Sequence, residues 1–363
     1  RAPLAIADGK IADQTERCVA LPGKLILPGI VDLHGDAFER HLAPRRGAMT
    51  DLARGMISTE ADLAANGITT AVLAQFYSWE GGLRGPDFAA RMLAALEAVK
   101  HRVDTDMRAQ LRLETHMIDA FPEILALIDQ HDIRYVAFND HLPHDHLARG
   151  KRPPRLTGTA RKSGRNPEKH LALMQELHAR SAEVPAALDA LCAKLAARGV
   201  QMASHDDATA GDIAAWQARG VTISEFPETK EAAEAAHGAG IPTVLGAPNV
   251  ARGASHKGKV SARELVAQGL CSALASDYHY PSPRNAAFDL ADLGLTDLAS
   301  AWAMVSATPA RVLGLADRGT LAPGQRADLV VLDAETRRLE ATLSGGSFTF
   351  LTGDTARRLT QRS

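Results

Sequence analysis

The feature that most constrains this chain is a series of short apolar runs that each end in a histidine or an acidic residue. The clearest is PGIVDLHGD at residues 28–36, where a strand-like run stops at His34 and Asp36. Residues i and i+2 of a strand point to the same face, so these two side chains leave the strand end together. Imidazole and carboxylate groups are ligands that zinc accepts, and the pair therefore indicates one wall of a metal site.

Eight strand-like runs recur along the chain and alternate with helical patterns. They lie at residues 30–34, 68–75, 111–116, 134–139, 200–204, 221–225, 241–246 and 272–276. Eight strands separated by helices predict an α/β fold in which a parallel sheet closes into a (β/α)8 TIM barrel. Residues 59–62 fit a capping box that would begin one of these helices, and Gly67 would end it.

Both ends of the chain have a different pattern. Residues 4–27 contain short β-like pieces around an Asp8-Gly9 turn, and residues 329–332 form another apolar strand. A hairpin is predicted around Gly345-Gly346. We therefore expect a small flanking β-sandwich domain built from residues 1–27 and 310–363, beside a barrel of residues 28–309. The chain begins at Arg1 instead of a methionine, which fits a natural start further upstream.

Residues 143–170 interrupt the alternation as a long basic insertion after the fourth strand. They contain eight Lys or Arg residues against only Asp145 and Glu168, together with Pro153-Pro154. Long loops without secondary structure are uncommon unless they act as lids or are disordered. Two interpretations stay open for this segment, a lid over the site and a solvated basic loop.

Composition excludes several classes of protein. The chain has 363 residues and a formal net charge of −2, and a dedicated nucleic-acid binder would be basic. Its cysteines, Cys18, Cys192 and Cys271, are widely spaced and form no CxxC motif, which predicts no disulfide framework and a cytoplasmic location. No apolar run approaches the roughly 18 residues of a membrane helix. We expect a small-molecule substrate and neither nucleic acid nor membrane as partner, and a homo-oligomer is left open.

Active sites of β/α barrels lie at the C-terminal ends of the strands. The predicted strand ends supply His34 and Asp36, then Glu114 and His116, Asn139-Asp140-His141, His205-Asp206-Asp207, Glu225, and Asp277 with His279. A mixture of imidazole and carboxylate without thiolate suits Zn, Mn or Fe. With a bridging carboxylate there are enough ligands for two ions, an arrangement that suits phosphoryl chemistry.

A glycine-rich, basic loop follows the seventh predicted strand. It reads GAPNVARGASHKGK from residue 246 and carries Asn249, Arg252, His256 and Lys257. Loops after strands 7 and 8 often bind phosphate in these barrels, because glycine lets backbone N–H groups approach and arginine makes bidentate contacts. A second cluster near the same face contains His41 and Arg45. The alternative for both is an ordinary charged surface.

These motifs together resemble those of the amidohydrolase superfamily. LPGIVDLH at residues 27–34 and GTLAPGQRADLV at residues 319–330 resemble its first barrel strand and its return into the flanking domain. A narrower resemblance, to the phosphonate-metabolism diphosphatases of the carbon–phosphorus lyase pathway, covers nearly the whole chain. The segments that carry it are His34-Gly35-Asp36 with HLAPR at 41–45, SHDDAT at 204–209, EFP at 225–227, GAPNVARGASH at 246–256 and SDY at 276–278.

The resemblance implies a metal-dependent hydrolase that cleaves α-D-ribose 1-methylphosphonate 5-triphosphate to the 5-phosphate and diphosphate. The chain departs from the common superfamily pattern, because Asp36 replaces a second histidine, no lysine ends the fourth strand, and the usual sixth-strand histidine is absent. The implied metal ligands are therefore His34, Asp36, Glu114, His141, His205 and Asp277. The resemblance implies two divalent ions, with zinc as the first expectation and Mn or Fe as alternatives.

The same resemblance assigns roles around those ligands. Asp277 is expected to bind metal and to take the proton from the nucleophile. The substrate phosphates would contact His41, Arg45, Asn249, Arg252, His256 and Lys257, and Asp206, Asp207 and Glu225 are further candidates. Two other functions stay open: an amidohydrolase that cleaves a C–N bond, such as a deacetylase or cyclic amidase, and a non-catalytic binding barrel.

Overall fold

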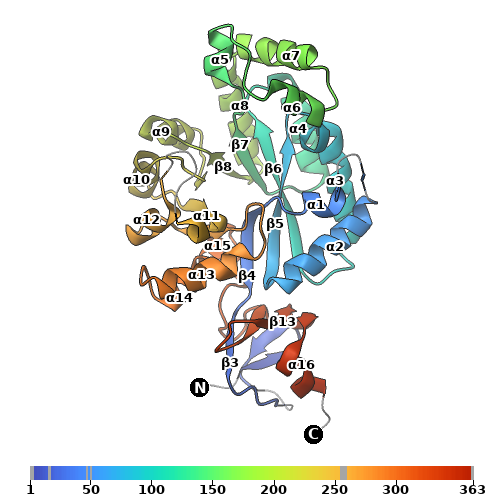
Figure 1. Cartoon of the computed structure of the whole chain (residues 1–363), viewed down its shortest axis with the longest axis vertical. Helices are drawn as coiled ribbons and strands as arrows, with labels where there is room; N and C mark the ends of the chain where they lie inside the picture. Colours follow the sequence, from blue (N-terminus) through green and yellow to red (C-terminus); the bar gives the residue numbers. More distant parts are fainter. Residues whose placement is uncertain (1–3, 15–17, 46–47, 50, 254–259, 361–363) are drawn as a thin grey trace. The chain divides into compact units, whose positions relative to one another are not determined.

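The computed structural model describes residues 4–14, 18–45, 48–49, 51–253 and 260–360 (Figure 1). The chain forms two compact units. The first unit comprises residues 1–73, 96–108 and 242–363, and the second comprises residues 74–95 and 109–241. The expected domain boundaries at residues 27 and 309 stay predictions.

An eight-stranded sheet runs through the chain in sequence order, and its first two strands pair in parallel, as do the third to sixth strands and the last two. Its strands are β4 (Ile30–Gly35), β5 (Ile68–Tyr77), β6 (Asp106–Glu114), β7 (Tyr135–Asn139), β8 (Gln201–His205), β9 (Ile223–Glu225), β10 (Thr243–Gly246) and β11 (Ala273–Ala275). An isolated bridge between Gly35 and Asp277 links the first and last strands, so the barrel is nearly closed. The predicted (β/α)8 barrel is confirmed.

Helices follow most of the strands of this sheet, whereas the last helix, α16, contacts the small sheet described below. Their bounds are α1 (Glu39–Leu42), α2 (Leu52–Ala65), α3 (Pro86–Val99), α4 (Phe121–Gln130), α5 (His144–Ala148), α6 (Leu156–Lys162), α7 (Pro167–Ala179), α8 (Val184–Ala197), α9 (Ala210–Ala218), α10 (Lys230–Gly238), α11 (Ala247–Arg252), α12 (Ala262–Ala267), α13 (Ser282–Asp292), α14 (Leu298–Ala303), α15 (Ala307–Val312) and α16 (Gly353–Thr360), with 3-10 turns η1 (Gly82–Arg84) and η2 (Ile118–Ala120).

One predicted helix start is wrong. Thr59 lies inside α2, fully buried, and its hydroxyl donates to the Gly55 carbonyl oxygen. The cap is Asp51, whose side chain accepts from the backbone N–H of Arg54 at 2.9 Å. Both residue types suit the N-cap position, and the helix continues upstream of Thr59 because Met56 is a buried position on its apolar face.

Both chain ends contribute to a four-stranded sheet, as predicted. Its order is β14 (Ser347–Leu351), β13 (Leu339–Ser344), β12 (Leu329–Asp333) and β3 (Lys24–Pro28), so the N-terminal β3 pairs with the C-terminal β12 (Figure 1). A separate two-stranded sheet joins β1 (Ala5–Ala7) to β2 (Lys10–Ala12). The Gly345-Gly346 turn has positive φ at both residues (58° and 83°), which matches the twist of a two-residue hairpin.

The basic insertion is largely helical. It contains α5, α6 and the start of α7, which lie together in Figure 1. Leu147, Leu156 and Met174 pack with Trp79 and Leu142 in a small apolar cluster. The segment therefore has a core of its own and is not the extended loop that its proline and charge content suggested.

Among the described residues, no helix has both the length and the apolar character needed to cross a membrane.

Candidate metal centre

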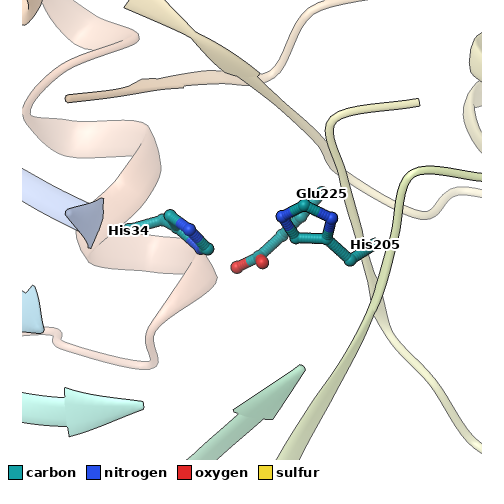
Figure 2. A group of neighbouring side chains, drawn as sticks. All are labelled: His34, His205 and Glu225. Carbon is teal, nitrogen blue, oxygen red and sulfur yellow. The ribbon is translucent and has the colours of Figure 1, made fainter. Parts of the chain in front are cut away.

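The ends of β8 and β9 bring an imidazole and a carboxylate together in the second unit. Figure 2 shows His205 next to Glu225, and their ligand atoms lie within 4.8 Å of each other. Glu225 is fully buried and accepts hydrogen bonds from Gln110 Nε2 at 2.7 Å and from the Tyr135 hydroxyl. Two donors on one oxygen hold this carboxylate in place, and such support is what a metal ligand needs.

The imidazole of His205 is oriented in the same way. Its Nδ1 lies 3.1 Å from Asp206 Oδ2, and its Nε2 lies 2.9 Å from Arg112 Nη2. Because a guanidinium only donates, Nε2 must be the acceptor, and the ring proton is on Nδ1, facing Asp206. Arg112 thus occupies the Nε2 lone pair, so a metal on Nε2 would have to displace this hydrogen bond, while the Asp206 carboxylate lies next to Nδ1.

Backbone strain marks the ends of these strands. Asp206 and Phe226, which follow His205 and Glu225, have φ values of 61° and 54°. Asp277, just beyond β11, has φ 54°. Non-glycine residues rarely adopt this left-handed conformation, which costs on the order of 1–3 kcal/mol each and clusters at functional sites. The left-handed residue changes the direction of the backbone immediately after each strand. The last side chain of the strand therefore stays at the strand end.

A second pair lies at the ends of β6 and β7. Glu114 is fully buried and accepts from Trp79 Nε1 at 3.1 Å and from the backbone N–H of His141 at 3.2 Å. His141 Nδ1 also contacts Glu114 Oε1. Burial lowers the pKa of His141, but the adjacent Glu114 carboxylate outweighs it and the pKa is raised overall. With Glu80, these side chains form a group whose ligand atoms lie within 4.8 Å of one another.

Arg112 is a buried cation that the sequence prediction missed. It is 5% exposed, lies over the Phe76 ring at 3.9 Å and donates from Nε to Asn139 Oδ1 at 3.1 Å. A buried charge is costly unless it has partners. The available signal was an arginine between two leucines, Leu111 and Leu113, close to a strand end, and its position beside His205 gives the site a fixed positive charge.

The first unit supplies the ends of β4 and β11. His34 is fully buried at the end of β4, and its carbonyl oxygen accepts from the Asp277 N–H at 3.0 Å. The Asp36 N–H donates to the Asp277 carbonyl oxygen at 2.9 Å. A side chain at Gly35 would meet Asp32 Oδ2 at 2.7 Å, so glycine is required between the two predicted ligands. The predicted trio of His34, Asp36 and Asp277 therefore shares one hydrogen-bonded strand end.

Two buried aspartates near the strand ends have supporting positions. Asp207 accepts from the hydroxyl groups of Ser204 and Ser224, at 2.5 and 2.9 Å, and so links β8 to β9. Asp32 accepts from the backbone N–H and the hydroxyl of Ser276. Burial raises the pKa of both carboxyl groups in spite of these bonds. Asp36, Asp206, Asp207 and Asp277 are outside the ligand groups formed by the described residues, and their direct roles stay predictions.

The predicted phosphate contacts have varied surroundings. His41 Nε2 lies 2.9 Å from Asp62 Oδ2, which Arg40 also contacts. Arg45 is exposed, Asn249 is half-buried in α11, and the exposed Arg252 ends that helix with its guanidinium 5.6 Å from the centre of the Tyr278 ring. His256 and Lys257 lie outside the described residues.

The donor chemistry of the strand ends fits a divalent metal. Imidazole nitrogen and buried carboxylate oxygen are ligands of zinc, manganese and iron, and the side chains of Trp79, Gln110 and Tyr135 donate hydrogen bonds that hold Glu114 and Glu225 in place.

Residues 168–355, slightly more than half of the chain, match the amidohydrolase family. The chain is also 33% identical, over 345 residues and 90% of each protein, to the alpha-D-ribose 1-methylphosphonate 5-triphosphate diphosphatase of Escherichia coli (strain K12). The chain belongs to the amidohydrolase family.

The chain is also similar in fold to several solved structures. N-acetylglucosamine-6-phosphate deacetylases from Thermotoga maritima and Pasteurella multocida have TM-scores of 0.59 and 0.61, at 16% and 10% identity. They cover 96% and 95% of this amidohydrolase, which covers 94% of each of them. A variant of the atrazine chlorohydrolase of Arthrobacter aurescens TC1, solved with zinc and atraton, has a TM-score of 0.57 at 14% identity, with 98% of this chain and 93% of that chain covered. At these identities the likeness concerns the fold alone.

Proposed function

We propose that this amidohydrolase is a metal-dependent diphosphatase, which cleaves alpha-D-ribose 1-methylphosphonate 5-triphosphate to the 5-phosphate and diphosphate in phosphonate catabolism. The observation that carries the proposal is the 33% identity along 90% of a relative with that named activity. The oriented imidazole and carboxylate ligands at the strand ends support it, because a hydrolase of this type needs a metal centre.

We assign the metal to side chains at the ends of the sheet strands. Glu114, His141, His205 and Glu225 would be joined by His34, Asp36 and Asp277, because all seven lie at or just beyond the C-terminal ends of strands in one parallel sheet. When bound, a divalent cation supplies charge stabilisation at a phosphoryl oxygen and makes water more acidic. Zinc in two copies is our first choice, and neither the identity nor the number of ions is assigned by the ligand types alone.

The chain's own groups would hold the substrate and move the proton. Asp277 is half-buried and positioned by its backbone bonds to β4, so its carboxylate would take the proton from the attacking water. Arg112 would offer a buried positive charge to the developing phosphoryl charge, and Arg252 would bind a phosphate near the rim. The substrate partner is thus a small phosphorylated sugar, and a cytoplasmic location is part of the same proposal.

Cleavage of a C–N bond is the second candidate function. Two solved structures of similar fold are deacetylases, but their likeness to this chain concerns the fold alone. A deacetylase needs room for an amide but has little use for a basic loop around Asn249 and Arg252. A non-catalytic barrel is the weaker alternative, since it predicts lost strand-end ligands, whereas His34, His205 and Asp277 are all present.

A paired assay separates these functions. The purified protein is incubated with the phosphonate ribosyl triphosphate and, separately, with a panel of N-acyl and cyclic amides, and diphosphate and amine are measured. We expect metal-dependent release of diphosphate without single-phosphate release. Efficient amide hydrolysis without diphosphate would replace our proposal with the amidohydrolase alternative.

A further inference from the structure

A second group of metal-type side chains lies in the second unit, beside the strand ends but separate from the proposed catalytic ligands. His116 follows β6, Asp140 follows β7, and His144 begins α5. One ligand atom from each lies within 4.8 Å of the other two. The rings of His116 and His144 have centroids 4.8 Å apart, and His178 of α7 lies 5.0 Å from His144 on its other side.

The hydrogen bonds around His116 determine which of its nitrogens carries the proton. Ser181 Oγ donates its single proton to the His178 carbonyl oxygen at 2.6 Å. Ser181 Oγ also lies 3.1 Å from His116 Nε2. Because its proton is already donated to His178, the hydroxyl oxygen can only accept from His116, and Nε2 therefore carries the ring proton. A metal binds the neutral form of the ring, in which only one nitrogen carries a proton. Its Nδ1 therefore has a lone pair.

That lone pair faces a carboxylate. His116 Nδ1 lies 3.6 Å from Asp140 Oδ2, and both atoms are electron-rich. The Thr115 hydroxyl, 3.1 Å from Nδ1, donates to it at present and can rotate away. The other oxygen of Asp140 accepts from the Leu142 N–H at 3.1 Å, which keeps Oδ2 directed toward the two histidines. A cation between Nδ1 and Oδ2 would satisfy both atoms.

His144 supplies the third ligand atom. Its Nε2 lies 2.9 Å from Asp140 Oδ2, and its Nδ1 lies 2.7 Å from His178 Nδ1. With a metal on Nε2, the ring proton of His144 would be on Nδ1 and would donate to His178. An oriented histidine of this kind is a usual partner behind a metal ligand.

We propose that His116 Nδ1, Asp140 Oδ2 and His144 Nε2 bind a zinc-class divalent ion, with His178 as the positioning residue of His144 and water as the fourth ligand. Tetrahedral zinc with bonds of about 2.0–2.2 Å places its ligand atoms roughly 3.3–3.6 Å apart. The 3.6 Å separation fits this geometry, and the 2.9 Å contact has to open by a few tenths of an ångström. Small rotations of the half-exposed His144 and Asp140 side chains can provide that change.

The ion would cross-link the inserted helix α5 to the ends of strands β6 and β7. Two of its ligands follow strand ends and the third belongs to α5, while His178 belongs to α7. These ligands flank Glu114 and His141, which lie two residues before His116 and one residue after Asp140. The proposed role is therefore structural, and it stabilises the inserted helices beside the catalytic ligands.

Zinc stoichiometry and affinity in the full chain test the proposal. Wild type, His144→Asn and His178→Ala are dialysed against buffered zinc, and protein-bound zinc is measured by elemental analysis. His146→Ala is the matched control, because His146 lies on the same short helix but outside the cluster. Circular dichroism checks that each variant is folded.

We expect His144→Asn to bind one zinc ion fewer than wild type and His146→Ala. His178→Ala should keep that ion with affinity weakened about 10- to 100-fold, as for other groups that orient metal ligands. Zinc should also slow proteolysis within residues 143–170 in wild type and His146→Ala, but not in His144→Asn. If His144→Asn fails to fold, His178→Ala decides by itself. Equal zinc number and affinity in wild type and the folded cluster variants would overturn the proposal.

Discussion

The hydroxyl group of Tyr135 provides a sharp test of the role of Glu225. Both side chains are buried, and the hydroxyl donates to Glu225 Oε1 alongside Gln110. Burial, reinforced by the Glu225 carboxylate, raises the pKa of Tyr135, so the hydroxyl keeps its proton and stays a donor. Tyr135→Phe removes one oxygen atom and keeps the ring, so it reports on this hydrogen bond with little change in packing.

The size of the effect follows from the charge of the acceptor. A hydrogen bond to a charged group contributes about 1.5–3 kcal/mol to stability. Groups that orient metal ligands typically change metal affinity by about 10- to 100-fold, which corresponds to about 1.4–2.8 kcal/mol. We therefore expect Tyr135→Phe to weaken zinc binding by about 10- to 100-fold and to lower the free energy of unfolding by a comparable amount.

A double-mutant cycle with Glu225→Gln separates the two roles of the carboxylate. Zinc affinity is measured by competition with a chelator, and unfolding is followed in metal-free protein. Once Glu225 is replaced by glutamine, Tyr135→Phe should have little further effect on zinc affinity. The two substitutions remove the same interaction, so their effects are not additive. If Tyr135→Phe alone lowers stability but leaves zinc affinity unchanged, Glu225 is a structural carboxylate and our assignment of it as a ligand is wrong.

Three further changes test other parts of the site and fold. Asp277→Asn should lower kcat for diphosphate release by about 10²–10⁴-fold, the usual contribution of a general base, with circular dichroism unchanged; near-normal turnover would remove Asp277 from catalysis. Arg252→Ala should lower kcat/KM for the triphosphate by roughly 10- to 150-fold, because a charge-assisted phosphate contact is lost, and an unchanged value would place Arg252 outside the substrate site. In the flanking sheet, burial opposes ionisation of Glu340, but Lys24 at 2.9 Å and Thr355 outweigh it and lower its pKa to about 2, from an ordinary 4.5. A carboxyl group with a lowered pKa stabilises the folded state above pH 4.5, and this stabilisation is lost as the pH falls toward 2. The Tm of wild type should therefore fall more steeply between pH 4.5 and pH 2 than the Tm of Lys24→Met. Equal slopes of Tm against pH in the two proteins would contradict this.

The barrel was predictable because its strands are almost wholly buried. A strand such as β5 is buried along its whole length and mostly apolar, and the polar residue that ends another strand, such as Glu114, His205 or Glu225, marks the point where the chain leaves the sheet. A run of apolar residues and the polar residue that ends it can both be recognised in a short stretch of sequence. The meeting of the two chain ends in a small β-domain was also predictable, since both ends had β-type patterns, and the structure forms it through the pairing of β3 with β12.

Other features depend on contacts that sequence pattern does not report. Arg112 looks like an ordinary polar residue until Phe76, Asn139 and His205 surround it. The left-handed conformations of Asp206 and Phe226 are imposed by the tertiary structure on residues without a strong intrinsic preference for them. The helices of the insertion were missed because Pro153-Pro154 and dense positive charge favour a loop locally, while packing around Trp79 decides the outcome.

The most direct test of the proposed function measures metal content and product release on the same sample. Elemental analysis of the purified protein is combined with an assay of diphosphate from the phosphonate ribosyl triphosphate, before and after chelation and after zinc is restored. We predict that diphosphate release is lost with the metal and returns with it, and that His205→Ala lowers both together. Full diphosphate release from metal-free protein, or a fully metal-loaded protein that releases none, would contradict the proposed function.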